Sequence, residues 1–216
     1  MDIILRPEKP EDYREAEHVT REAFWNHHVP GCDEHYLLHI MRSCPAFVPE
    51  LSIVALWDGK ILGHVAYVKS FIHSNDGKEH EVLFLGPISV LPDYQGRGIG
   101  RRLIAHSKQL AREMGFRAIV LYGDPNYYTR QGFVPAETLG LRTADNMYAV
   151  ALHVCELYEN ALLGIQGRCV EHEIYEVDAA AAALFDRQFP AKEKISGTPS
   201  QKWFEASCAL RRPAES

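Results

Sequence analysis

The sequence predicts a mixed α/β fold in which helices flank a partly antiparallel sheet. Asp58-Gly59 separates two β-rich runs, which is a strong local signal for a hairpin. A second turn at residues 75–78 leads into a third strand. A helical pattern and another short apolar run follow, and this order is typical of a βαβ unit with two parallel strands.

The first half of the chain contains two helices and four strands. Pro10 and the acidic residues after it suit the first turn of a helix that runs to about residue 25. Gly86-Pro87 interrupts the third hairpin strand, where we expect a bulge or a splay. The predicted elements are a strand at 3–5, helices at 10–25 and 34–42, and strands at 52–57, 61–71 and 81–90.

The second half begins with a long amphipathic helix. Ile99, Leu103, Leu110 and Met114 recur on one face of this helix, and Gly115 is suited to end it. The predicted elements are a helix at 98–114, a strand at 118–122, a turn or short helix at 124–130, strands at 148–157 and 171–177, a helix at 178–185 and a polar loop at 190–199.

Composition sets limits on function. The chain has 216 residues, of which 46% are hydrophobic and 24% charged, as in globular proteins. A net charge of −6 argues against nucleic acid as a partner. Five scattered cysteines without a CxxC pair predict reduced thiols in a cytoplasmic protein. We also expect no signal peptide and no membrane partner, since no apolar run is long enough to span a bilayer.

A glycine-rich stretch joins the third hairpin strand to the long helix. Gly96, Gly98 and Gly100 let the backbone approach a ligand closely and turn several N–H groups one way. The start of the helix adds the positive end of its dipole, so the stretch is suited to a pyrophosphate. Arg97 and Arg101 can add charge-assisted hydrogen bonds.

Two nucleotide-binding motifs fit this stretch poorly. A kinase-type P-loop requires GxxxxGK[ST], but no Lys-Ser or Lys-Thr follows these glycines. A dinucleotide fingerprint requires GxGxxG, whereas the spacing here is GxGxG, and Val120-Leu121 stand where an acid should bind the ribose. Both mismatches argue against the interpretation that the protein is a nucleotide-dependent oxidoreductase.

Three landmarks in order resemble the GNAT superfamily of acetyltransferases. They are Gln95-x-x-Gly98-x-Gly100, the preceding Ile88-Ser89-Val90-x-Pro92, and the later Tyr128-x-x-x-Gly132-Phe133. The resemblance covers residues 3–157. Residues 156–167 and 197–201 are similar to a bacterial subgroup of uncharacterised members with a C-terminal extension. We therefore predict a GNAT-like core at 1–160 and an extension at 161–216 packed on it.

The resemblance implies a sheet whose fourth and fifth strands splay apart around acetyl-CoA. Its pyrophosphate would lie at the glycine turn, and its pantetheine would pair like a strand with Ile88 and Val90. A main-chain N–H near Val90 would bind the acetyl carbonyl, and Tyr128 would protonate the leaving thiolate. The cofactor-binding residues so implied are Ile88, Ser89, Val90, Gln95, Gly96, Arg97, Gly98, Ile99, Gly100 and Arg101.

The group that deprotonates the acceptor is left open. Some members of the family carry a glutamate eleven residues before the signature Gln, and that position here is Phe84. A water chain, His64, His80 or an acid from elsewhere could serve, or the reaction could need no strong base. No cysteine stands at a recognised nucleophile position, which favours direct transfer. The histidine-rich residues 24–47 are expected to line the acceptor pocket rather than to bind a metal, and no metal is expected.

The predicted function is an N-acyltransferase that moves an acetyl group from acetyl-CoA to a primary amine of a small molecule or peptide by direct attack. The alternative is a catalytically weak acyl-CoA-binding or regulatory module. The presence of Tyr128 favours the enzyme, and Phe84 favours the module. The oligomeric state stays open, a homodimer included.

Overall fold

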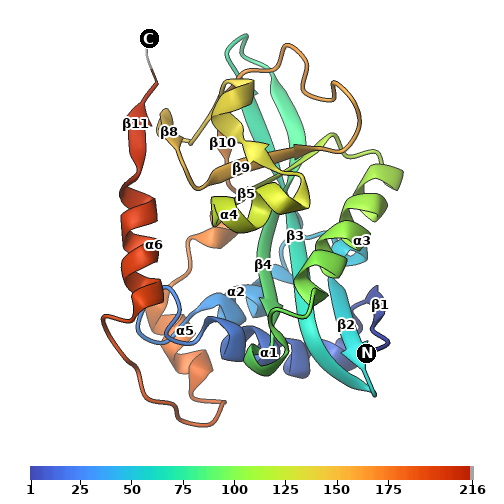
Figure 1. Cartoon of the computed structure of the whole chain (residues 1–216), viewed down its shortest axis with the longest axis vertical. Helices are drawn as coiled ribbons and strands as arrows, with labels where there is room; N and C mark the ends of the chain where they lie inside the picture. Colours follow the sequence, from blue (N-terminus) through green and yellow to red (C-terminus); the bar gives the residue numbers. More distant parts are fainter. Residues whose placement is uncertain (215–216) are drawn as a thin grey trace.

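The computed structural model describes residues 1–214 and consists of a mixed sheet with helices on both faces (Figure 1). Its strands run in the order β1-β2-β3-β4-β5-β9-β6, with β10 beside β3 and β7 beside β10. The strands of this sheet are β1 (Ile4–Pro7), β2 (Ile53–Trp57), β3 (Lys60–Ser74), β4 (Glu79–Val90), β5 (Ala118–Tyr122), β6 (Val134–Pro135), β7 (Leu141–Arg142), β9 (Leu152–Glu156) and β10 (Gly167–Val170).

The β2–β3 hairpin forms at the predicted turn. Asp58 and Gly59 both have positive φ angles, 50° and 74°, as a two-residue hairpin of the I′ type requires. β3 continues through a long antiparallel pairing with β4, from Gly63 opposite Val90 to His73 opposite Glu79. The predicted meander is therefore confirmed.

The pairing of β4 with β5 is short. The two strands are parallel neighbours, as the βαβ pattern predicts, but they pair only at Leu83–Ile119 and Phe84–Val120. β4 then continues to Val90 through a cis Gly86-Pro87 peptide. Beyond Phe84, β4 thus keeps β3 on one edge and has lost β5 from the other, which is the expected splay.

The helices divide between the two faces of the sheet. α1 (Tyr13–Phe24) and α2 (Glu34–Met41) pack with α5 (Ala179–Asp186) on one face, which we call the α2 face. α3 (Ile99–Glu113) and α4 (Pro125–Tyr128) cover the other, the α3 face. On α3, Ile99 and Leu103 are buried as predicted, but Met114 is 43% exposed because the helix ends at Glu113.

The strand predicted at 171–177 is wrong. The strand is β10, which ends at Val170, and the chain then makes a 3₁₀ turn from Glu173 to Tyr175. The His172 ring accepts a hydrogen bond from the Ile174 N–H, and such a local bond competes with strand pairing. β-propensity alone did not reveal this turn.

Two further predictions need correction. The single strand predicted at 148–157 is divided into β8 (Met147–Ala149) and β9, and β8 pairs instead with β11 (Arg211–Pro213). The polar loop ends where α6 (Pro199–Ala209) begins, a helix that the prediction missed. Thr198 and Gln201 form a capping box at its start, so the signal was present in the sequence.

A buried ionic cluster ties α1 and α2 to the sheet. The Arg42 guanidinium bonds Glu8 at 2.7 Å and Glu17 at 2.5 Å, and all three side chains are nearly inaccessible. Ser52 and His64 complete the contacts of Glu8. Burial alone would raise the pKa of the Glu8 carboxyl, but hydrogen bonds and positive charge from His64 and Arg42 lower it to about 2.

Replacing Arg42 by Ala should therefore destabilise the fold by about 3–5 kcal/mol, because two buried carboxylates lose their partner. Chemical denaturation at neutral pH measures this loss. Lys9→Ala is the control, since the Lys9–Glu11 pair is exposed and such pairs contribute about 1 kcal/mol or less. Equal stability of the two variants would contradict a stabilising role for the buried Arg42 cluster.

The wild-type protein should also lose stability in acid. The stabilisation that Glu8 contributes is present above pH 4.5 and is lost as the pH falls toward 2, and chemical denaturation at a series of pH values measures it.

Candidate functional site

The glycine turn stands between the end of β4 and the start of α3. Gly96 and Gly98 have φ angles of 72° and 81°, which side chains rarely tolerate, and Gly98 caps the helix. A Cβ added at Gly96 would meet nothing within 4 Å. The first N–H groups of this 15-residue helix have no carbonyl partner within it, so the helix start is suited to an anion.

The side chains of the turn have different roles. Arg97 lies over the Tyr94 ring, with its guanidinium carbon 5.2 Å from the ring centre. Gln95 donates a hydrogen bond to the Val90 carbonyl at 3.0 Å and so braces the turn. Ile99 is buried against the core, so only its backbone can meet a ligand. Arg101 remains beside Gly98 at the helix start.

The last residues of β4 present backbone groups to the open edge. Leu91 N–H donates to the Leu62 carbonyl on the β3 side. Because backbone groups alternate between the two edges of a strand, those of Ile88 and Val90 point to the opposite edge, where β5 is missing. The Ser89 side chain is buried on the α2 face and meets Thr20 of α1 at 3.1 Å.

Tyr128 stands at the end of α4, on the α3 face. Its ring packs directly over Gly123, where an added Cβ would lie 2.1 Å from the ring, and it meets the Phe133 ring edge-on. Only 8% of Tyr128 is exposed, and burial raises its pKa above the ordinary phenol value. The hydroxyl is therefore protonated at neutral pH.

Tyr127 was overlooked as a site residue. Its hydroxyl lies 2.6 Å from the position that a Cβ on Gly100 would take, so Gly100 leaves room for it at the start of α3. Tyr127 thus packs directly against the glycine turn. Only the absence of a side chain at Gly100 could have hinted at this packing.

Aromatic side chains fill the α2 face where β4 and β5 separate. Phe84 meets the rings of Tyr122 and Tyr175 at 5.9 Å and 5.5 Å. The Tyr175 hydroxyl donates to the Gly86 carbonyl at 3.1 Å, so it reaches the backbone of β4 just beyond the last pair with β5. Tyr175 belongs to the C-terminal extension, outside every segment that carries the resemblance, and sequence reasoning missed it.

The histidine-rich segment serves largely as packing. His35 is fully buried beside the rings of Phe185 and Phe189, 3.1 Å from Asp186, and burial lowers its pKa to about 4. His39 contacts Glu17 instead. Within residues 1–214, no three His, Cys, Asp or Glu side chains are grouped to hold a metal ion.

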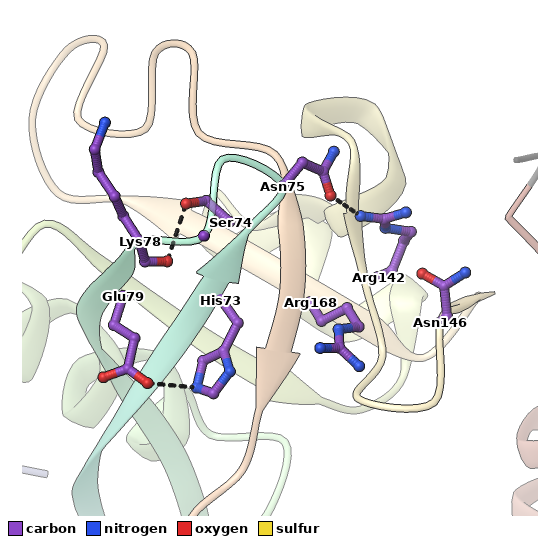
Figure 2. A pocket seen from close by; sticks show the side chains of 9 residues that line it. His73, Ser74, Asn75, Lys78, Glu79, Arg142, Asn146 and Arg168 are labelled. Atoms are coloured by element: carbon purple, nitrogen blue, oxygen red, sulfur yellow. Dashed lines mark hydrogen bonds and ion pairs between the residues drawn. The ribbon is translucent and has the colours of Figure 1, made fainter.

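A polar cavity of about 410 Å³ lies at the opposite end of the β3–β4 hairpin (Figure 2). Its cations are Lys78, Arg142 and Arg168, and Arg142 bonds Asn75. His73 faces Glu79 across the strand pair at 3.4 Å. None of the predicted site residues lines this cavity, so we place the candidate site at the splay of β4 and β5.

Comparison with known proteins identifies the family. The model of the family described as "Acetyltransferase (GNAT) family" matches residues 9–133. The chain is 29% identical over 172 residues to the uncharacterised N-acetyltransferase YhbS of Escherichia coli, which covers 79% of this chain and 97% of that protein. It is 36% identical over 88 residues to the uncharacterised E. coli N-acetyltransferase YjhQ, where the match spans 40% of this chain and about half, 48%, of that relative.

Two solved structures share the fold over most of the chain. The crystal structure of E. coli YhbS in complex with CoA has a TM-score of 0.72 at 27% identity, over 81% of this chain and 92% of that one. A GNAT family acetyltransferase from Brucella melitensis in complex with acetyl-CoA has a TM-score of 0.65 at 30% identity, over 81% and 98%. The chain belongs to the GNAT family of acetyltransferases, which confirms the resemblance and the predicted fold.

No helix in residues 1–214 is both long and apolar enough to cross a membrane. The division between a core at 1–160 and an extension at 161–216 stays a prediction, although β10 of that extension pairs with β3 inside the main sheet.

Gly98→Val should lower acetyl-CoA affinity by about tenfold or more, because the new side chain stands in front of the open N–H groups. Gly77→Val is the matched control, since Gly77 has a φ of 83° and lies in the distant hairpin turn. Both variants should lose similar thermal stability, and only Gly98→Val should lose affinity by calorimetry. Wild-type affinity in folded Gly98→Val would exclude the turn as the binding site.

Proposed function

We propose that the protein transfers an acetyl group from acetyl-CoA to a primary amine of a small molecule or peptide by direct attack. The observation that carries this proposal is the open edge of β4, which leads directly into an anion-binding turn. Two structures of similar fold are complexes with CoA and acetyl-CoA, and this ligand chemistry fits the same turn.

The glycine turn would bind the pyrophosphate of acetyl-CoA. The first N–H groups of α3 have no carbonyl partner within the helix, and Arg97 and Arg101 add positive charge. The pantetheine amides would take the place of β5 beside Ile88 and Val90. Ser89 and Ile99 contribute through their backbone, since both side chains are buried in the protein.

The reaction requires a neutral amine, a stabilised oxyanion and a proton for the departing sulfur. A backbone N–H at the open edge of β4, near Val90, is suited to the oxyanion. A phenol has an ordinary pKa of about 10 against about 8.5 for a thiol, so Tyr128 can hydrogen-bond the developing thiolate even where full transfer is uphill. Burial raises the pKa of Cys169 to about 12, so this thiol is not poised as a nucleophile.

The alternative is a module that binds acyl-CoA without efficient catalysis. Phe84 favours it, because a carboxylate found there in some relatives is absent and the ring is buried. Incubation with acetyl-CoA and a panel of primary amines distinguishes the two functions. The enzyme releases free thiol together with acetylated amine detected by mass spectrometry, whereas the module binds acetyl-CoA and releases neither.

Tyr128→Phe removes one hydroxyl and keeps the packing against Gly123 and Phe133. It should lower kcat by about 10²- to 10⁴-fold, the usual contribution of a general acid, and leave acetyl-CoA affinity nearly unchanged. Thiol release and calorimetry measure the two effects. Tyr158→Phe is the control because Tyr158 is 43% exposed after β9. If Tyr128→Phe keeps wild-type kcat while chemistry limits the rate, Tyr128 only packs.

A further inference from the structure

Glu171 is a half-buried carboxylate to which the proposed reaction gives no role. It follows β10 directly, and the last pair of that strand joins Val170 to Phe71 of β3. The Glu171 charge acts on the Cys169 thiol, so the two side chains lie close together. Cys169 is buried in the cluster of the α2 face that also contains Phe84. Glu171 therefore lies beside the α2 face of the splay.

The surroundings of Glu171 are apolar and phenolic. Burial first, and then the nearby Glu171 charge, raise the pKa values of Tyr122, Cys169 and Tyr175. Further out, Tyr122 faces the Arg211–Asp145 ion pair, and Tyr175 faces Tyr67 and Cys44.

The Glu171 carboxylate has no compensating cation nearby. In residues 1–214 the structure gives it no ion pair. Burial raises the pKa of Glu171 to about 7. One step beyond the last pair of β10, Ser70 is also buried on this side, and its hydroxyl has no hydrogen-bond partner among the described residues. The Glu171 carboxylate and the Ser70 hydroxyl are therefore both able to accept a hydrogen bond from a polar ligand.

This carboxylate stands where the sheet opens. Tyr122 ends β5, and Tyr175 bonds the Gly86 carbonyl of β4, so the two tyrosines mark the two arms of the splay. Phe84 packs between them. Phe84 also occupies the position at which some relatives carry a glutamate. In this chain the extension brings a carboxylate to the same neighbourhood from the residue that follows β10.

We propose that Glu171 is the general base that takes the proton from the acceptor ammonium. This inference rests on the proposed acetyl transfer. The ammonium loses one proton to the Glu171 carboxylate, and the neutral amine forms the N–C bond as the C–S bond of acetyl-CoA breaks. The second proton of the attacking nitrogen balances the thiolate as free thiol, and Glu171 returns its proton to solvent. The products are the acetamide, CoA and one proton.

The rate that depends on Glu171 should fall at acid pH, because the base acts in its ionised form. Only the ionised carboxylate can accept a proton, and the fraction ionised falls tenfold per pH unit below the pKa. With a pKa of about 7, the wild-type advantage over a variant without the carboxylate should be constant above neutrality and shrink tenfold per unit below it.

The test compares three variants with the wild type, using acetyl-CoA and propylamine as substrates from pH 5.5 to 9. Glu171→Gln should lower kcat by about 10²- to 10⁴-fold at high pH, with the ratio to wild type shrinking below pH 7. Propylamine ionises identically in every reaction, so its titration cancels in the ratio. Glu171→Asp should retain the pH dependence at reduced kcat. Glu173→Gln is the matched control on the same turn, since Glu173 is exposed.

Each remaining outcome overturns the inference in a distinguishable way. Wild-type kcat in Glu171→Gln excludes a base at this position. A raised KM for propylamine at unchanged kcat means that the carboxylate only binds the cation. Loss of acetyl-CoA affinity or of thermal stability in Glu171→Gln means a structural role. If the wild type binds acetyl-CoA and acetylates no amine, the proposed function fails and this inference falls with it.

Discussion

The end of pairing between β4 and β5 is the constraint on which the rest of the structure depends. After Phe84 and Val120 the two strands part, and the backbone of β4 keeps one edge without a strand partner. Unsatisfied backbone groups are costly when buried, so such an edge persists where water or a ligand can reach it. The glycine turn, α3 and α4 then take their places around an opening that this one interruption creates.

The opening joins two faces with different chemistry. The α3 face carries the glycine turn and Tyr128, which suit a phosphate-bearing thioester. The α2 face carries Tyr122, Tyr175 and Glu171, which suit a cationic amine in a half-buried setting. The two substrates would therefore meet through the sheet from opposite sides, and the buried Arg42 cluster holds the helices of the second face in place.

The sequence predicted the features that depend on residues close together in the chain. The Asp58-Gly59 hairpin, the glycine turn and the parallel β4–β5 pair depend on neighbouring residues, and the structure confirms them. Glu171 and Tyr175 could not be placed, because their positions depend on β10 pairing with a strand far back in the chain. The sequence also predicted a strand at 171–177, where the chain instead makes a turn in which His172 accepts a hydrogen bond from the Ile174 N–H.

The pairing of β10 with β3 has a consequence for the order of assembly. The strands from β2 to β5 and the intervening α3 come from one continuous stretch of chain, so the part of the fold that carries the glycine turn can form from short loops. Val170 must meet Phe71 across about 100 intervening residues, and closing a long loop costs entropy that short loops avoid. During synthesis β3 also emerges well before β10, so the side of the splay that carries Glu171 is completed last.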